Sequence, residues 1–326
     1  MNNLKNSESM SGLAFSARTE PVFSVKDKTD FSTGAGPLSF TGVIDYPLTN
    51  DYMFRSVMQS NEKVLKGFLC SLLHLKPGDV RRVQVLNPIE LGKKISDKEF
   101  ILDIRILMNN NTAINLEMQV NNQYNWPERS LVYLSRLFDG LNAGDTYKTV
   151  KPAFQIGILN FTLFPKYPEF FSTYKMLNTK NYQKYSDKFT IHVLDLTQIH
   201  LAEKGDKDYG LDRWAQLFNA LTWEDFKMIS ADNESMQEAG KTLFTLNAND
   251  LIRDLCEARE DYRRTWDGVK LEMEEKDTAI AELKSSNEEK DMFIAELKSS
   301  NKEKDLLIVS LKEQLASLQE LKNSEN

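Results

Sequence analysis

Apolar residues recur at every third or fourth position from Thr49 to Leu73, which is the spacing of one helix face. The run stops at Lys76, Pro77 and Gly78, residue types that end a helix. The pattern predicts one long buried helix whose apolar face comprises Met53, Phe54, Val57, Met58, Val64, Leu65, Phe68, Leu69, Leu72 and Leu73.

Alternating segments rich in β-branched residues follow this helix. They predict strands at 80–87, 99–108 and 112–120, then a helix from Pro127 to about Leu141, because proline suits a first helical turn. Two more strands are expected at 154–164 and 189–196, and a helical segment at 211–228. This order predicts an α/β domain whose mixed sheet is flanked by helices.

The last part of the chain contains an internal repeat. EEKDTAIAELKSSN at 274–287 is followed by EEKDMFIAELKSSN at 288–301 and by a looser copy at 302–315. Fourteen residues are two heptads, so the repeat predicts a C-terminal α-helical coiled coil with Asn at some seam positions, which favours a parallel homodimer. A solvated single helix or a disordered tail is the alternative. The predicted dimerisation residues are Ile280, Leu283, Asn287, Ile294, Leu297, Asn301, Ile308 and Leu311.

These patterns divide the chain into a disordered leader at 1–40, an α/β domain at 41–245, and a helix with coiled coil at 246–326. The net charge of −7 is uneven: residues 41–200 carry 19 basic and 15 acidic side chains, and residues 201–326 carry 18 and 29. A polyanionic ligand is therefore compatible with the middle of the chain.

No apolar run is long enough for a membrane span or a signal peptide, so we expect a cytoplasmic protein without a membrane partner.

One hairpin carries residues suited to chemistry. If Asn109 to Asn111 form its turn, residues whose numbers sum to 220 lie opposite one another, which places Asp103 opposite Glu117 with Cβ atoms roughly 5 Å apart. Two facing carboxylates repel unless a cation such as Mg²⁺ lies between them. The facing carboxylates are therefore either a metal site or part of a hydrated polar stripe. Ile101 and Leu107 on the same face indicate that other residues cover this face of the hairpin.

Around these residues the sequence resembles a known family. Asp103 in ILDIRI, followed by Glu117-Met118-Gln119, is similar to the Asp…Glu-x-(Lys/Gln) motif of the PD-(D/E)XK nuclease superfamily. TNDYMFRSVM at 49–58, the helix at 128–147 and the strand at 154–161 resemble more narrowly the recombination-promoting nucleases, also called PD-(D/E)XK family transposases. The resemblance covers about residues 43–230 and implies a restriction-endonuclease-like fold.

The resemblance also implies roles for individual residues. Asp103 and Glu117 would bind Mg²⁺, with Mn²⁺ as a substitute. Gln119 stands where most of the superfamily has lysine, and glutamine can hydrogen-bond but carries no charge. Asp51 would support a metal-bound water, or is a first-turn carboxylate satisfied by the helix dipole. The cations expected to contact DNA are Lys93, Lys94, Lys98, Arg129 and Arg136.

The implied function is a Mg²⁺-dependent DNA endonuclease of the recombination-promoting or transposase type, acting as a homodimer. The alternative is a non-catalytic DNA-binding or scaffolding protein that keeps the fold and works through its coiled coil. The sequence lacks the motifs of other functional classes. Gly240-Lys241-Thr242 has no P-loop glycine before it, and the three histidines do not have the spacing of a zinc site.

Overall fold

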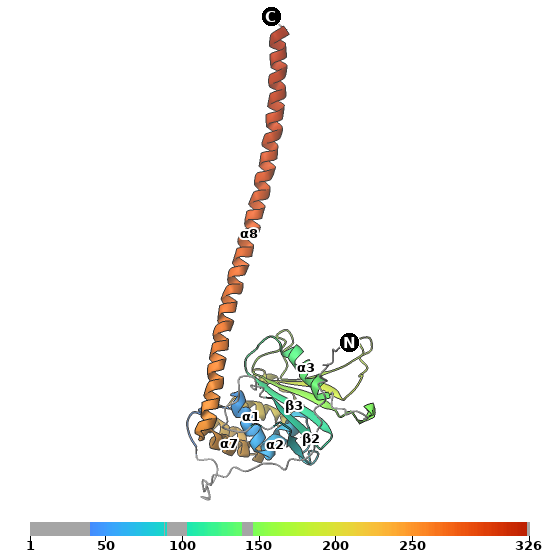
Figure 1. Ribbon diagram of the computed structural model, residues 1–326, viewed down its shortest axis with the longest axis vertical. Coiled ribbons are helices and arrows are strands. Elements are labelled where there is room, and N and C mark those ends of the chain that lie inside the picture. The colour runs from blue at the N-terminus through green and yellow to red at the C-terminus, as the bar shows by residue number, and fades with distance from the viewer. Residues whose placement is uncertain (1–39, 88, 90–102, 139–145, 325–326) are drawn as a thin grey trace, which may run out of the picture. The chain divides into compact units, whose positions relative to one another are not determined.

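The computed structural model describes residues 40–87, 89, 103–138 and 146–324 (Figure 1). The chain divides into two compact units, residues 1–260 and 261–326. Of the leader predicted at 1–40, only Phe40 lies within the described residues.

The first unit is built on a six-stranded mixed sheet of order β1-β2-β3-β4-β6-β5. Strands β1, β2 and β3 are antiparallel, β3, β4 and β6 are parallel, and β5 is antiparallel to β6. The prediction of a mixed α/β fold is confirmed, but the edge strand β5 was not predicted. The strands are β1 (Val83–Val85), β2 (Ile104–Met108), β3 (Thr112–Gln119), β4 (Ala153–Leu159), β5 (Phe171–Lys175) and β6 (Phe189–Asp195).

The single long helix predicted over 49–73 is wrong. Two helices replace it, because the side chain of Asn61 accepts hydrogen bonds from the N–H groups of Lys63 and Val64 and so starts a new helix. The segment predicted at 211–228 is likewise two helices.

The helices are α1 (Asp51–Ser60), α2 (Glu62–Leu72), α3 (Trp126–Phe138), α4 (Lys204–Asp208), α5 (Leu211–Phe218), α6 (Trp223–Ser230), α7 (Glu234–Asn247) and α8 (Asp250–Ser324), with 3₁₀ turns at Tyr147–Thr149 and Ile199–Leu201.

The two faces of the sheet are covered unequally. Even-numbered residues of β3 and β4, such as Leu116 and Ile156, join a large core with α1, α2, α5, α6 and α7. The opposite face packs against α3 (Figure 1). Trp126, Leu159 and Val193 form a second, smaller core there. Both faces of β3 are therefore buried, including its polar odd-numbered positions.

The approach of α3 to the sheet depends on Gly157 in β4. A Cβ atom at this position would lie 2.1 Å from Cζ2 of Trp126, whose indole is buried at the start of α3. Pro127 lies in the same first turn. Glycine is required here because it alone leaves space for the indole to pack on the strand.

Helix α8 is continuous for 75 residues. Its first turns belong to the first unit, where Ile252 and Cys256 are buried in the large core. Over the repeat, the predicted helix is confirmed and its apolar side chains are exposed in the single chain: Ile280, Leu283, Ile294, Leu297, Ile308 and Leu311. Within the described residues, no helix has an apolar stretch sufficient to cross a bilayer.

Replacing Gly157 with Ala should destabilise the first unit by about 1–3 kcal/mol, because the added methyl group overpacks a filled site. Urea denaturation measures the loss. Gly78→Ala is the matched control, since nothing lies within 4 Å of a Cβ at that position. Equal stabilities of the two variants would show that α3 does not depend on this contact.

Candidate active site

The register of the β2–β3 hairpin is the one predicted. Ile104 pairs with Leu116 and Ile106 with Ile114, so paired numbers sum to 220. Asn109 to Asn111 form the turn, and φ is 52° at Asn109 and 61° at Asn110, left-handed values that asparagine adopts more readily than most residues. Asp103 directly precedes β2, and continuing the register places it opposite Glu117 on the face covered by α3.

Both carboxylates are buried, with 8% of Asp103 and 4% of Glu117 exposed. The hydrated polar stripe is therefore excluded. Three oxygens here are buried and have no hydrogen-bond partner among the residues that the structure describes: Oδ1 of Asp103, Oε2 of Glu117 and Oε1 of Gln119. Such oxygens are costly when left unsatisfied, and they are the ligand type that hard divalent cations prefer.

The number of these ligands limits what the site can hold. In the part of the chain that the structure describes, no group of three or more His, Cys, Asp and Glu side chains is arranged to bind a metal. Two carboxylates and one amide oxygen fit a cation such as Mg²⁺, which keeps several waters and binds phosphate oxygens as well.

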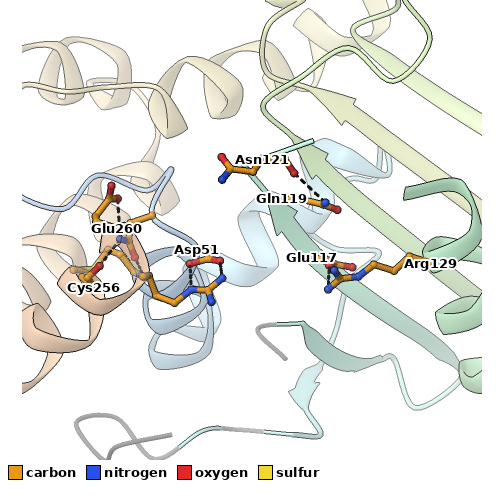
Figure 2. Close-up of polar contacts among 10 residues, drawn as sticks. Asp51, Glu117, Gln119, Asn121, Arg129, Cys256 and Glu260 are labelled. Carbon is orange, nitrogen blue, oxygen red and sulfur yellow. Dashed lines mark hydrogen bonds and ion pairs between the residues drawn. The ribbon is translucent and has the colours of Figure 1, made fainter. Parts of the chain in front are cut away.

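Arg129 of α3 forms an ion pair with one of these carboxylates. Its Nη2 lies 2.6 Å from Oε1 of Glu117 (Figure 2). Its guanidinium also lies over the ring of Tyr133, 5.3 Å from the centroid. The approach of α3 at Gly157 places Arg129 here, since Gly157 pairs directly with Glu117. Arg129 was predicted to contact DNA; in the structure its partner is Glu117.

Burial dominates the electrostatics of both acids. It raises the pKa of Glu117 from 4.5 to about 7, and the negative charges of Asp103 and Asp51 add to the rise, while Arg129 opposes it. Burial also raises the pKa of Asp103, against the opposing charges of Arg55 and Arg105. The pair therefore favours protonation over two negative charges.

The amide of Gln119 has a defined orientation. Its Nε2 donates to the backbone carbonyl of Asn121 at 3.0 Å, and a carbonyl can only accept (Figure 2). The other end of the amide, the unpartnered Oε1, is thus an acceptor. Where most of the superfamily would offer a lysine cation, this chain offers an oxygen.

Asp51 is the first residue of α1, as predicted, but its carboxylate has a specific partner. Nε of Arg259 donates to Oδ1 of Asp51 at 2.9 Å, and Nη2 of Arg259 pairs with Oδ2. Arg259 belongs to the first turns of α8, and neighbouring Asn50 donates to the Cys256 carbonyl and to Glu260 (Figure 2). Asp51 thus contributes charge near Glu117 while an arginine binds its oxygens.

Sequence reasoning missed two residues beside the candidate ligands. The buried guanidinium of Arg55 donates to the backbone carbonyls of Asp103 and Asn87, and Asn87 itself donates to the Asp103 carbonyl at 3.1 Å. These contacts position the residue before β2. The available clue in the sequence was an arginine among the apolar residues of the predicted helix, and the structure leaves 1% of Arg55 exposed.

The other residues predicted to contact DNA are only partly described. Lys93, Lys94 and Lys98 lie outside the described residues. Arg136 is exposed on α3, two turns after Arg129.

Comparison with known proteins agrees with this geometry. The model of the PD-(D/E)XK nuclease family transposases matches residues 48–272, about two thirds of the chain. The protein belongs to this family, as the resemblance in its sequence indicated. No curated protein and no solved structure matches the chain.

Removing the charge of Glu117 should stabilise the protein at high pH. Because its folded pKa of about 7 exceeds 4.5, ionising Glu117 costs stability as pH rises between these values, by about 3 kcal/mol above pH 7. Without metal, Glu117→Gln should therefore be more stable than wild type at pH 8 and equal to it near pH 4.5. Urea denaturation at both pH values measures this. Glu169→Gln, at an exposed carboxylate, should change neither, and an equal gain at both pH values would contradict the burial effect.

Proposed function

We propose that this protein is a cytoplasmic, Mg²⁺-dependent DNA endonuclease of the recombination-promoting or transposase type. The observation that supports this most directly is the buried pair Asp103 and Glu117, with unpartnered oxygens, in a chain of the PD-(D/E)XK nuclease family. Nucleases of this superfamily generally use divalent metal ions.

Asp103 and Glu117 would hold the cation, with Oε1 of Gln119 as a further ligand atom. A bound divalent cation lowers the pKa of a coordinated water and offsets charge at the phosphate. The cation would then balance the negative charge of Glu117 in place of Arg129. Nε of Arg129 is buried and has no hydrogen-bond partner within the described residues, so it would donate to a phosphate oxygen only after the guanidinium turns away from Glu117.

Cleavage of supercoiled plasmid with Mg²⁺ tests the proposal. Asp103→Asn and Glu117→Gln should each abolish cleavage, because each removes a charged ligand without changing the shape of the side chain. In the same buffer Mg²⁺ should raise the melting temperature of the wild type and leave that of Glu117→Gln unchanged, since a ligand stabilises only the fold that binds it.

Asp208→Asn, at an exposed aspartate on α4, is the control and should cut as the wild type does. Cleavage that persists in Asp103→Asn would point to a contaminating nuclease. A wild type that neither cuts nor responds to metal would favour the non-catalytic DNA-binding or scaffolding alternative.

We further propose that the repeat of α8 forms a parallel two-stranded coiled coil. Its apolar seam is exposed in the single chain, and an isolated amphipathic helix is marginal in water without a partner. Asn287 and Asn301 at a positions pair best when two helices are parallel and in register. A homodimer would place two nuclease domains at one end of the coil, which suits cutting both strands of a duplex.

Sedimentation of the full chain tests the dimer. Ile308→Asp places a charge on the seam and should give a monomer, whereas Ser310→Asp adds the same charge off the seam and should leave the dimer intact. Asn287→Leu with Asn301→Leu should strengthen association and admit higher oligomers. A wild-type monomer at tens of micromolar, or equal effects of the two Asp variants, would contradict the proposal.

A further inference from the structure

Two segments meet at the amino-terminal ends of β4 and β6. Residues 146–151 lead into β4, and residues 175–188 include the end of β5 and join it to β6. Nζ of Lys188 donates to the Val150 carbonyl at 2.7 Å, and the Ala153 N–H donates to the Lys188 carbonyl at 2.8 Å. The two segments therefore form one continuous surface, here called the tyrosine-lysine surface.

This surface is strongly basic in an acidic protein. It carries one acid, Asp187, whose carboxylate is 2.9 Å from Nζ of Lys175 and 2.7 Å from Nζ of Lys184. The formal charge of the two segments is +5, against −7 for the whole chain. Its six cations are Lys148, Lys151, Lys175, Lys180, Lys184 and Lys188.

Three tyrosines lie among these lysines with their rings in solvent: Tyr147 is 89% exposed, Tyr182 75% and Tyr185 82%. The segment that carries two of them has a defined conformation, because the Tyr185 N–H donates to the Met176 carbonyl at 3.0 Å and Tyr182 has a left-handed φ of 58°. A bulky residue in that conformation is uncommon. The rings contribute little to the core, so their flat faces are available to a ligand.

The tyrosine-lysine surface is separate from the candidate active site. Glu117 pairs with Gly157 of β4, and Gly157 pairs with Val193 of β6. The strands β4 and β6 begin four residues earlier, at Ala153 and Phe189. Four residues of extended chain span roughly 13 Å, so the surface begins about that far from the level of Glu117.

We infer that the tyrosine-lysine surface binds single-stranded nucleic acid. Lysines attract the phosphate backbone, and exposed rings stack on bases whose faces a duplex would hide. An anionic membrane is the other polyanion to consider, but the tip of the 175–188 segment, Asn178 to Gln183, is polar apart from Tyr182 and so unsuited to insertion. The inference does not depend on the proposed nuclease activity.

Fluorescence anisotropy with a labelled 20-nucleotide oligonucleotide tests it, using the full chain in EDTA so that nothing is cut. Tyr182→Asn with Tyr185→Ala should weaken binding at least tenfold, because each lost stack costs about 1–3 kcal/mol. Asparagine is chosen since it tolerates the left-handed backbone. Tyr182→Phe with Tyr185→Phe keeps both rings and should bind within about twofold of the wild type.

Three controls make the result specific. Tyr167→Ala removes a ring of similar exposure on the loop after β4, outside the two segments, and should not change binding. Lys180→Gln should reduce the slope of log affinity against log salt by about 0.7. Glu117→Gln should bind the oligonucleotide as the wild type does, so a failed nuclease assay leaves the inference standing.

Comparing binding to different polyanions identifies which one the surface recognises. DNA and RNA single strands of one sequence distinguish a DNA surface from an RNA surface, and either supports the inference. Binding that is tighter to the matching duplex, that survives loss of both rings, or that occurs on phosphatidylserine vesicles and not on oligonucleotides would overturn it.

Discussion

The burial of two carboxylates on one covered sheet face is the constraint on which the arrangement around the candidate site depends. Taking Asp103 and Glu117 out of water is costly, and their mutual repulsion adds to the cost. The protein offsets part of it with Arg129, which bonds Glu117, and with Arg55, whose charge acts on Asp103. The pKa of each acid remains raised, so this compensation is incomplete, and a divalent cation would add to it.

That compensation requires α3 to lie close to the sheet. The contact between Trp126 and Gly157 determines the separation, and Arg129 follows Trp126 by three residues, nearly one helical turn. A larger residue than glycine in β4 would displace the helix and with it the guanidinium. A residue with no polar atom in its side chain thus controls the electrostatics of Glu117.

The sequence was sufficient to predict local pairing and insufficient to predict distant partners. The register of Asp103 against Glu117 could be predicted because a short turn and strict alternation leave one consistent pairing. The break at Asn61 was missed because the apolar period continues through it while a side-chain cap ends one helix and starts the next. Asp51 and Arg259 are 208 residues apart, and no periodicity relates them. The strand β5 was missed because its sequence, FSTYK, lies at the edge of the sheet with its last three residues exposed, so no alternation of apolar and polar side chains marks it.

Glutamine at position 119 changes the balance of charge in a definite direction. A lysine there would add a further cation to Arg129 and Arg55, which already offset part of the charge of the two carboxylates. With glutamine that cation is missing and an additional oxygen is present, so the attraction for a divalent cation is greater. The attraction for a phosphate is correspondingly weaker when no cation is bound. Binding of substrate at this site should therefore depend on prior binding of metal, and positively charged side chains elsewhere on the chain become more important for holding nucleic acid.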